Sequence, residues 1–269
     1  MSITIQKKYG DLQKLIVSYK SVVIGFSGGV DSTFLSKVAY DVLGNLSIAV
    51  IGVSPSYPTR EEEEAIKIAN DIGISYITIE TEEMNVEKYR LNQGDRCYHC
   101  KKELYTKLQQ IKAEYNFNEI LDGTNYSDLN DIRPGFKATE ELNIKKPLLE
   151  ACLTKEEIRT LSKELALPTW DKPSFACLSS RFPVGTEITK DSLSIVERGE
   201  QVLYELGFRQ FRLRYYEKLA RIELLEEDFP KVIDKSIRNK IIDSLSQLGF
   251  SHVTLDLLGY GTRLKNKSI

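Results

Sequence analysis

The sequence predicts an α/β protein, with a doubly wound parallel sheet followed by a smaller C-terminal α/β domain. Over about the first 180 residues, short strand-like segments alternate with helical ones, which is the pattern of parallel strands joined by crossover helices. A glycine-rich turn follows the first of these strands. After about residue 184 the strands follow one another more closely. We therefore expect two domains, spanning residues 1–184 and 185–269.

The period of the apolar residues predicts the elements of the first domain. A short run of β-branched residues predicts a strand at residues 21–26, and further strand-like segments lie at residues 47–53, 75–80 and 119–122. Apolar residues at helical spacing predict helices at residues 32–43, 60–72, 101–115 and 154–165. The last of these begins at Thr154 and has Glu157 three residues later, which is the pattern of a capping box.

The second domain is expected to be small and to place strands next to each other in the chain. Helices are predicted at residues 191–206 and 230–248, and a glycine follows each of them directly. Strands are predicted at residues 211–215, 220–224 and 253–257.

Composition excludes several classes of protein. The 269 residues include 37 Lys and Arg against 39 Asp and Glu, a net charge of −2, whereas a generic nucleic-acid binder would be basic. With 16 glycines and 8 prolines the chain is not of low complexity. No apolar stretch approaches the roughly 18 residues of a membrane span, and the N-terminus has no apolar signal region. We expect a cytoplasmic protein whose four cysteines stay reduced.

The sharpest local signal is the hexapeptide SGGVDS, between a predicted strand and a predicted helix. Its glycines let the backbone turn tightly and approach a ligand, while the helix start offers unpaired N–H groups and a positive dipole end. Together these features form an anion site. The loop lacks the ending of a Walker motif. The candidate ligands for ATP phosphates, with Asp31 as the Mg²⁺ ligand, are Ser27, Gly28, Gly29, Asp31 and Ser32.

This hexapeptide resembles the pyrophosphate loop of the ATP pyrophosphatase superfamily. The resemblance implies an adenine nucleotide alpha hydrolase-like first domain that uses ATP and Mg²⁺. Such enzymes cleave ATP between the α- and β-phosphates, attach AMP to a carboxylate or carbonyl oxygen, and then let nitrogen or sulfur displace AMP. Gly123 and Thr124 end the fourth predicted strand and are further ATP-binding candidates, because nucleotide sites gather at the carboxyl ends of parallel strands.

Three of the four cysteines suggest a ligand set. Cys97 and Cys100 form a Cys-x-x-Cys motif, and Cys177 follows much later. A redox pair is disfavoured because the motif does not follow the first strand. A structural zinc would need His99 or Cys152 as a fourth ligand, and a [4Fe–4S] cluster on three thiolates would leave one iron open. Spacing alone leaves both metals open, and Cys152 is interpreted as an ordinary buried thiol.

Further motifs resemble the LarE family of ATP-dependent sulfur transferases over nearly the whole chain. They lie at residues 121–125, 131–138, 179–183, 211–214 and 220–224. The resemblance implies that the protein adenylates a carboxylate of pyridinium-3,5-biscarboxylic acid mononucleotide and converts it to a thiocarboxylate, in two rounds. The product leads to the nickel-pincer nucleotide cofactor of lactate racemase and related enzymes.

The family has two sulfur chemistries. In one, a single cysteine gives up its own sulfur; in the other, three cysteines hold a [4Fe–4S] cluster whose open iron carries a sulfide. Ala176 stands near the place of the sacrificial cysteine, and Cys177 comes next. The resemblance therefore implies the cluster route here, with the sulfide attacking the acyl-adenylate.

The remaining candidates lie in or near these motifs. Lys101 and Glu200 resemble residues that the family keeps near the chemistry, so they join the three cysteines as catalytic candidates. Arginines are candidates for binding the substrate phosphate, because a guanidinium group can donate two hydrogen bonds to it. Arg212 and Arg214 are alternate residues of a predicted strand and so share one face. An exposed strand face would give the same pattern. The substrate-binding candidates are Arg133, Lys137, Ser180, Arg181, Arg212 and Arg214.

Three other functions fit parts of the sequence. A tRNA thiolase also uses a pyrophosphate loop and a cluster, but this chain has a single Cys-x-x-Cys motif and no basic domain. An amidotransferase-type synthetase, making NAD or GMP, leaves the cysteines unexplained. The third is a non-catalytic ATP-binding module with a structural zinc. We expect a small nucleotide substrate, a sulfide source and a homo-oligomer, with no membrane or nucleic acid as partner.

Overall fold

The computed structural model describes residues 3–130 and 134–261. It divides into two compact units, the first formed by residues 1–89 and 93–175 and the second by residues 90–92 and 176–269. The sequence places the division after residue 184, whereas the structure begins the long segment of the second unit at Ala176. Cys177 and the motif that follows it therefore belong to the second unit.

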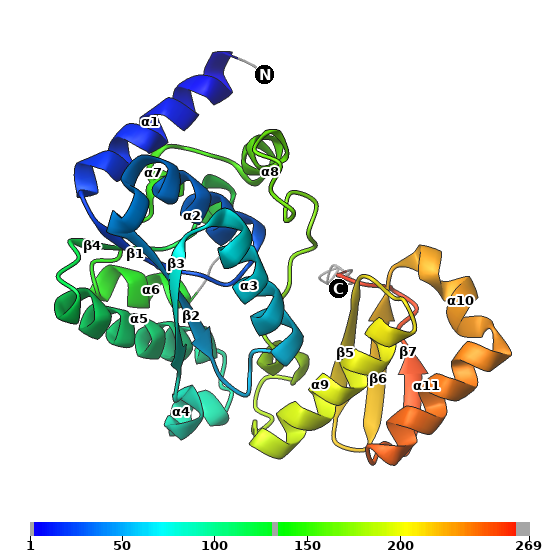
Figure 1. Cartoon of the computed structure of the whole chain (residues 1–269). Coiled ribbons are helices and arrows are strands. Elements are labelled where there is room, and N and C mark those ends of the chain that lie inside the picture. Colours follow the sequence, from blue (N-terminus) through cyan, green and yellow to red (C-terminus); the bar gives the residue numbers. More distant parts are fainter. Residues whose placement is uncertain (1–2, 131–133, 262–269) are drawn as a thin grey trace, which may run out of the picture. The chain divides into compact units, whose positions relative to one another are not determined.

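The first unit is built on a parallel sheet with the order β3-β2-β1-β4 (Figure 1). Its strands are β1 (Val22–Gly25), β2 (Ser47–Val53), β3 (Ser75–Glu80) and β4 (Glu119–Leu121). In register, Val22 pairs with Ser47 on one side and with Glu119 on the other. Because all strands are parallel, their carboxyl ends meet at one edge of the sheet. The predicted fold class is confirmed.

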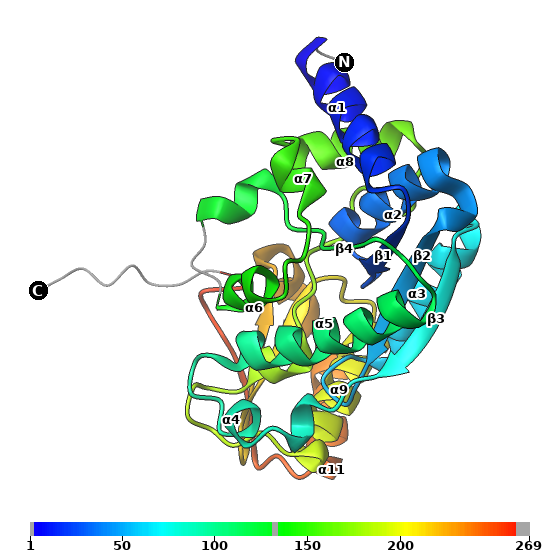
Figure 2. The same cartoon turned by 90° about the vertical axis from the view of Figure 1, so that its left-hand side faces the viewer.

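Helices cover both faces of this sheet, as a doubly wound fold requires. The helices of this part of the chain are α1 (Ile3–Tyr19), α2 (Val30–Leu43), α3 (Thr59–Ile72), α4 (Glu87–Arg90), α5 (Arg96–Glu114), α6 (Gly135–Glu141), α7 (Pro147–Glu150) and α8 (Lys155–Glu164). Val22 and Ile24 belong to the apolar core that includes α1, α2, α3 and α8. Val23 between them belongs to a separate core with α5, on the other face (Figure 2).

The second unit holds a three-stranded sheet with the order β5-β6-β7. Strands β5 (Phe211–Tyr216) and β6 (Leu219–Leu224) are antiparallel, and β7 (His252–Leu255) runs parallel to β6. Its helices are α9 (Lys190–Glu205), α10 (Phe229–Ile233) and α11 (Lys235–Gln247). A Cβ on Gly199 would lie 2.8 Å from Leu213 and 3.1 Å from Leu245, so this glycine lets α9 pack closely on β5 and α11.

Several boundaries differ from those that the sequence predicts. The capping box of Thr154 and Glu157 is confirmed. The helix expected at 230–248 is broken, because Asp234 caps the start of α11 by accepting from two backbone N–H groups. The helix expected from residue 101 begins at Arg96, so that the Cys-x-x-Cys motif forms its first turn. The sequence reasoning did not predict α1, although its core-facing residues Ile5, Tyr9, Leu12 and Ile16 recur at helical spacing.

In the described part of the chain, no helix is long and apolar enough to cross a membrane.

Candidate active site

The predicted phosphate loop joins the carboxyl end of β1 to the start of α2. Gly28 has a φ of +61°, and a Cβ there would lie 2.9 Å from the Cα of Ala65, so the turn needs glycine for conformation and for space. Gly29 is the N-cap of α2 and has no side chain that could cap the helix start. The hydroxyls of Ser27 and Ser32 are 3.2 Å apart beside it. This arrangement suits an anion bound to the helix start.

Asp31 lies in the first turn of α2 and has two unlike oxygens. Its Oδ2 accepts a hydrogen bond from Nζ of Lys155 at 2.5 Å. Its Oδ1 is buried and has no hydrogen-bond partner. Burial raises the pKa of Asp31, and the Lys155 ammonium opposes that rise. A buried carboxylate oxygen without a donor, at the edge of a phosphate loop, fits a Mg²⁺ ligand well.

The turn after β4 lies against the phosphate loop. A Cβ on Gly123 would lie 3.2 Å from the backbone nitrogen of Ser32 and 3.4 Å from the Cβ of Asp31. The adjacent Asp122 shapes the turn, since its Oδ1 accepts from the backbone N–H of Thr124 at 2.7 Å and from the Thr124 hydroxyl. The structure thus brings Gly123 to the loop, while the hydroxyl of Thr124 is directed to Asp122.

Asp122 also connects this edge of the sheet to α5. Its Oδ2 accepts from Nζ of Lys101 at 3.0 Å and from the buried hydroxyl of Tyr105. Burial alone would raise the pKa of Asp122, but the Lys101 ammonium and the hydrogen bonds from Thr124 and Tyr105 outweigh it and lower the pKa to about 2. Lys101, a catalytic candidate, is therefore held at the nucleotide edge of the sheet by a buried carboxylate.

The Cys-x-x-Cys motif forms the first turn of α5, one turn before Lys101. Cys97 is exposed and Cys100 is half-buried. A Cβ on Gly135 would lie 2.8 Å from Cδ of Lys101 and 3.5 Å from the carbonyl oxygen of Cys97, so the start of α6 packs closely on this turn. His99 has a carboxylate partner, because its Nε2 lies 3.1 Å from Oδ2 of Asp95.

Two substrate-binding candidates come from the segment around α6. Arg133 lies outside the described residues. Lys137 is on α6, where its ammonium is 4.0 Å from a carboxylate oxygen of Glu141 and 5.5 Å from the ring centre of Tyr98. The Lys137 side chain is 74% exposed, so it has a loose ion pair and remains available to a ligand.

Sequence reasoning missed three residues that support the phosphate loop. Lys172 donates to the carbonyl oxygen of Gly28 at 3.3 Å, and both Glu61 and Glu64 of α3 lie 2.9 Å from its ammonium. The hydroxyl of Tyr57 donates to the carbonyl oxygen of Ser27 at 3.0 Å. Lys155 is the third, through Asp31. No local pattern marks these residues, because each meets the loop from a distant part of the chain.

In the second unit, Arg181 and Glu200 form a buried ion pair. Nε and Nη2 of Arg181 donate to the two Glu200 oxygens at 2.7 and 2.9 Å, and the arginine is 1% exposed. Its Nη1 donates to the carbonyl oxygen of Ala176 at 2.6 Å and to the Ser180 hydroxyl at 2.9 Å. The pair thus fixes the backbone around Cys177. A direct contact of Arg181 with a phosphate would require this network to open.

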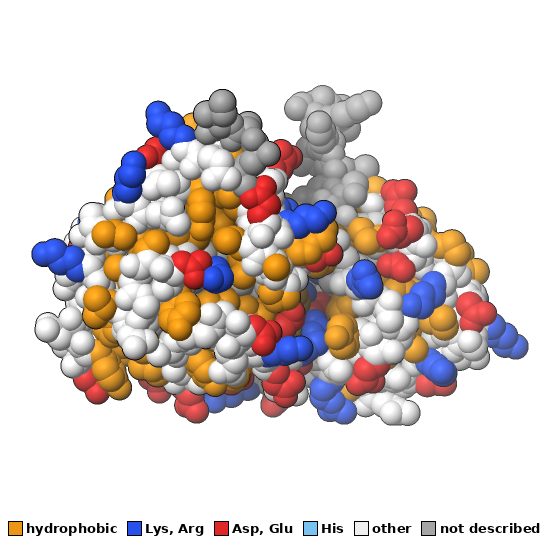
Figure 3. Space-filling model, turned by 45° about the horizontal axis from the view of Figure 1, so that its top comes forward, with side chains coloured by type: hydrophobic (Ala, Val, Ile, Leu, Met, Phe, Trp, Pro, Cys, Tyr) orange, Lys and Arg blue, Asp and Glu red, His pale blue; other side chains and the backbone are white. Residues whose placement is uncertain are grey.

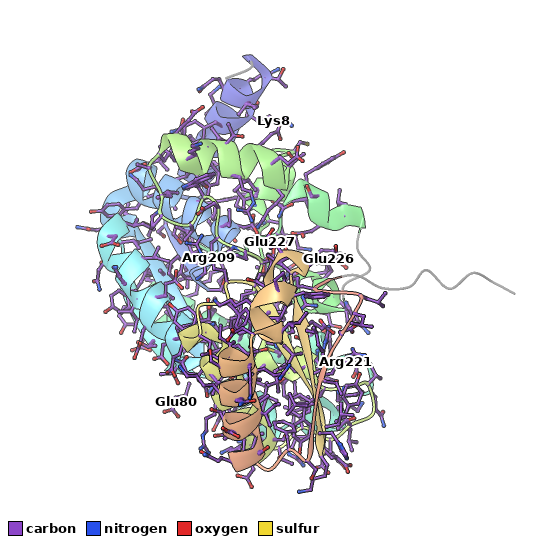
Figure 4. The ribbon with its side chains drawn as sticks, turned by 90° about the vertical axis from the view of Figure 1, so that its right-hand side faces the viewer. Lys8, Glu80, Arg209, Arg221, Glu226 and Glu227 are labelled. Carbon is purple, nitrogen blue, oxygen red and sulfur yellow. The ribbon has the colours of Figure 1, made fainter. Side chains whose placement is uncertain are left out.

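A cluster of arginines lies on the sheet of the second unit. Arg214 donates to both oxygens of Glu223, at 2.7 and 3.1 Å, and to the carbonyl oxygen of Ser180 at 2.6 Å. Arg221, labelled in Figure 4, lies 3.2 Å from Glu223, and Arg212 lies 3.9 Å from it. The guanidinium of Arg212 is 4.6 Å from the ring centre of Tyr260. Asp256 also lies 3.5 Å from Arg221, so two carboxylates face three guanidinium groups, which still leaves positive charge for an anionic ligand.

Metal-binding groups were sought among the same residues. None of the four cysteines, all of them described, forms a disulfide, and Cys152, which the sequence suggested to be buried, is exposed. Within the described ranges, no three His, Cys, Asp or Glu side chains gather as a group that could hold a metal ion. Cys97 and Cys100 belong to the first unit and Cys177 to the second. Thiol donors one helical turn apart have the chemistry that zinc and iron–sulfur clusters require.

Comparison with known proteins identifies the family. A family model described as NAD synthase matches residues 9–117. An uncharacterized protein of Synechocystis sp. is 41% identical over 263 residues, which cover 98% of both chains. Pyridinium-3,5-bisthiocarboxylic acid mononucleotide synthase of Lactiplantibacillus plantarum is 34% identical over 268 residues, covering 99% of this chain and 96% of the synthase. The chain belongs to the LarE family.

The LarE resemblance indicated by the sequence motifs is thus confirmed. More distant relatives share part of their length with this LarE-family chain. The glutamine-hydrolyzing GMP synthase of Lactobacillus acidophilus is 23% identical over 286 residues, which cover 95% of this chain and 53% of that enzyme. Together with the NAD synthase model, which covers the phosphate loop and α5, this match agrees with an ATP site in the first unit.

Proposed function

We propose that this LarE-family protein is an ATP-dependent sulfur transferase acting on pyridinium-3,5-biscarboxylic acid mononucleotide. The observation that carries the proposal is the phosphate loop, with the partnerless Oδ1 of Asp31, in a chain that is 34% identical to a pyridinium-3,5-bisthiocarboxylic acid mononucleotide synthase over nearly its whole length. The protein would convert a carboxylate of the mononucleotide to a thiocarboxylate and consume ATP in doing so.

The reaction needs two displacements. A carboxylate oxygen of the substrate attacks the α-phosphorus of ATP, the bond to the β-phosphate oxygen breaks, and pyrophosphate leaves. A sulfur nucleophile then attacks the acyl carbon, and AMP leaves with the oxygen. The protein contributes chiefly by positioning and by neutralising charge at phosphate. The helix start at Gly29, the hydroxyls of Ser27 and Ser32, and the carboxylate of Asp31 supply these functions.

We propose the three cysteines as ligands of a [4Fe–4S] cluster. The spacing of Cys97 and Cys100 on one helical turn supports it, together with the resemblance of the three-cysteine pattern to the cluster-bearing type of the family. When bound, such a cluster supplies the sulfur atom for transfer. Lys101 lies one turn beyond Cys97 and is held by Asp122, so it stays a candidate for orienting the acyl-adenylate. A cytoplasmic location would keep these thiols reduced.

The arginine cluster is proposed to bind the phosphate of the substrate nucleotide. Arg212 and Arg214 lie on one face of β5, and Glu223 orients both. Ser180 is linked to this cluster through its carbonyl oxygen, and Arg181 with Glu200 holds the segment that carries Cys177. Lys137 is proposed as a further substrate-binding residue.

One rival function has a specific observation in its favour. The NAD synthase model and the GMP synthases both match the part of the chain with the phosphate loop, and such enzymes use ammonia as the nucleophile. A tRNA thiolase is less well supported, because acidic and basic side chains are interspersed on the face seen in Figure 3, and the net charge is −2.

Release of pyrophosphate separates these functions. Protein prepared without oxygen is incubated with MgATP and, in separate reactions, the pyridinium mononucleotide, xanthosine monophosphate or deamido-NAD with ammonia, and unmodified tRNA. The proposal expects release that depends on the pyridinium mononucleotide. Release that depends on tRNA, or on ammonia with either of the other two acceptors, would overturn it. Full sulfur transfer by a preparation without iron would overturn the cluster.

A further inference from the structure

Lys155 forms an ion pair with Asp31, the candidate Mg²⁺ ligand of the phosphate loop. It is the first residue of α8, and its ammonium is 2.5 Å from Oδ2 of the carboxylate. The two side chains are 27% and 24% exposed, so this pair is largely shielded from water. The second oxygen of the same carboxylate, Oδ1, is buried and has no partner.

Neighbouring cations differ from Lys155 in how firmly they are held. Lys172 is held by two carboxylates and a loop carbonyl. Arg159, one turn along α8, donates to the carbonyl oxygens of Trp170 and Lys172 at 2.6 and 2.8 Å. In the described part of the chain, the only side-chain partner of the Lys155 ammonium is Asp31. Lys155 is therefore the cation of this group that can change partners at least cost.

An ammonium and a Mg²⁺ ion on one small carboxylate repel each other strongly where water is scarce. Mg²⁺ in nucleotide sites is held by one or two carboxylates and by phosphate oxygens, commonly those of the β- and γ-phosphates. Those oxygens would then offer anionic acceptors to an ammonium displaced from Asp31. Lysine suits this exchange, because its flexible stem lets the ammonium group, with its three N–H donors, move from one acceptor to another.

We propose that Lys155 is a polyphosphate-binding residue that exchanges partners when MgATP enters. Before ATP binds, the ammonium neutralises Asp31. When Mg²⁺ takes the carboxylate, the ammonium binds the phosphates that leave as pyrophosphate. This inference rests on the proposed use of ATP and adds a residue to that site.

Binding measurements on Lys155→Met test the exchange, with Mg²⁺, Mg-pyrophosphate and AMP as separate probes. A charge-assisted hydrogen bond contributes roughly 1.5–3 kcal/mol, so Mg-pyrophosphate should bind about 10- to 100-fold more weakly. Mg²⁺ alone should bind more tightly, because its competitor is gone, and AMP should bind as in the wild type. Lys155→Arg should recover most of the pyrophosphate affinity.

Lys8→Met is the matched control. Lys8, labelled on α1 in Figure 4, pairs with Glu157 on the same helix α8 at 2.8 Å, but it does not reach the loop. This variant should bind all three probes as the wild type does. A folded Lys155→Met protein that binds Mg-pyrophosphate normally, or binds Mg²⁺ no better, would overturn the proposal.

A second test uses the wild-type chain and does not depend on how a variant folds. Brief labelling with an amine-reactive reagent, read by peptide mass spectrometry, reports the reactivity of each lysine. Mg²⁺ alone should raise the labelling of Lys155, since the ammonium leaves Asp31, and Mg-pyrophosphate should lower it below the level without ligand. Labelling of Lys8 should stay constant. Equal labelling of Lys155 in all three states would refute the exchange.

These outcomes are separate from those of the proposed function. If the mononucleotide is not the substrate, pyrophosphate release with it fails, while the Lys155 measurements are unaffected. If Lys155 does not bind polyphosphate, the binding and labelling results are negative, while sulfur transfer by the wild type is unaffected.

Discussion

Asp122 connects the turn beside the phosphate loop to α5, the helix that carries Cys97 and Cys100. It orients Lys101 through Oδ2 and shapes the turn before Thr124 through Oδ1. Because the carboxylate is buried and ionised, it stabilises the fold only while it keeps its charge. This single residue therefore links folding, pH dependence and the position of a catalytic candidate.

The first prediction concerns acid stability. Burial alone would raise the pKa of Asp122, but Lys101 and two hydroxyl donors outweigh it and lower the pKa from 3.8 to about 2. Because the pKa is lower in the folded state, the ionised carboxylate favours folding by about 2 kcal/mol above pH 4. This contribution is lost as the pH falls from about 4 to about 2. Urea unfolding across that range should show a shallower loss for Asp122→Asn and for Lys101→Met than for the wild type. Parallel curves for all three proteins would contradict this account.

The second prediction concerns the buried pair of Arg181 and Glu200. Truncating one partner leaves the other charged and buried, so Arg181→Met and Glu200→Leu should each lower the free energy of unfolding by about 3–5 kcal/mol. The double variant should lose clearly less than the sum of the two. The control is Arg198→Met, because Arg198 is exposed on α9, the helix that carries Glu200. This variant should lower the free energy of unfolding by less than about 0.5 kcal/mol. Additive losses would show that the pair is not coupled.

At the scale of elements, the phosphate loop depends on the close approach of α3. In Gly28→Ala the new Cβ would lie 2.9 Å from backbone and side-chain atoms of Ala65, at a φ of +61°. We expect a loss of about 1–3 kcal/mol in stability and at least a tenfold loss in MgATP affinity, measured by calorimetry. Gly10→Ala, inside α1 with open space around it, should instead stabilise by about 0.5–1 kcal/mol. Normal MgATP binding by Gly28→Ala would refute the role of the loop.

The sequence predicts elements well where their signal is local. The first three parallel strands each contain several β-branched residues, and α8 is marked by the capping box of Thr154. The start of α5 was predicted five residues late, because Cys97, Tyr98 and His99 lack an apolar period. The segment after Pro230 reads as one helix, yet Asp234 caps a new one there. Helix α1 was missed although Tyr9, Leu12 and Ile16 recur at helical spacing and face the core.

At the scale of the whole molecule, the candidate residues are divided between the two units. The ATP ligands, Lys101, Cys97 and Cys100 belong to the first unit, and Cys177 with the arginine cluster belongs to the second. The sequence could predict the loop residues, since all of them lie in the six consecutive residues of the SGGVDS motif. It could not predict Lys155 or Lys172, because these reach Asp31 and Gly28 from 124 and 144 positions away. Such contacts follow from the tertiary fold and leave no local pattern.

The mass of the pyridinium mononucleotide after reaction tests the central claim most directly. Iron-loaded protein prepared without oxygen is incubated with the biscarboxylate, MgATP and sulfide, and the nucleotide is analysed by mass spectrometry. We predict that sulfur replaces one carboxylate oxygen and then a second, on the other carboxylate, with AMP and pyrophosphate formed in equal amounts. An unchanged nucleotide mass, with MgATP bound and the protein folded, would contradict the account.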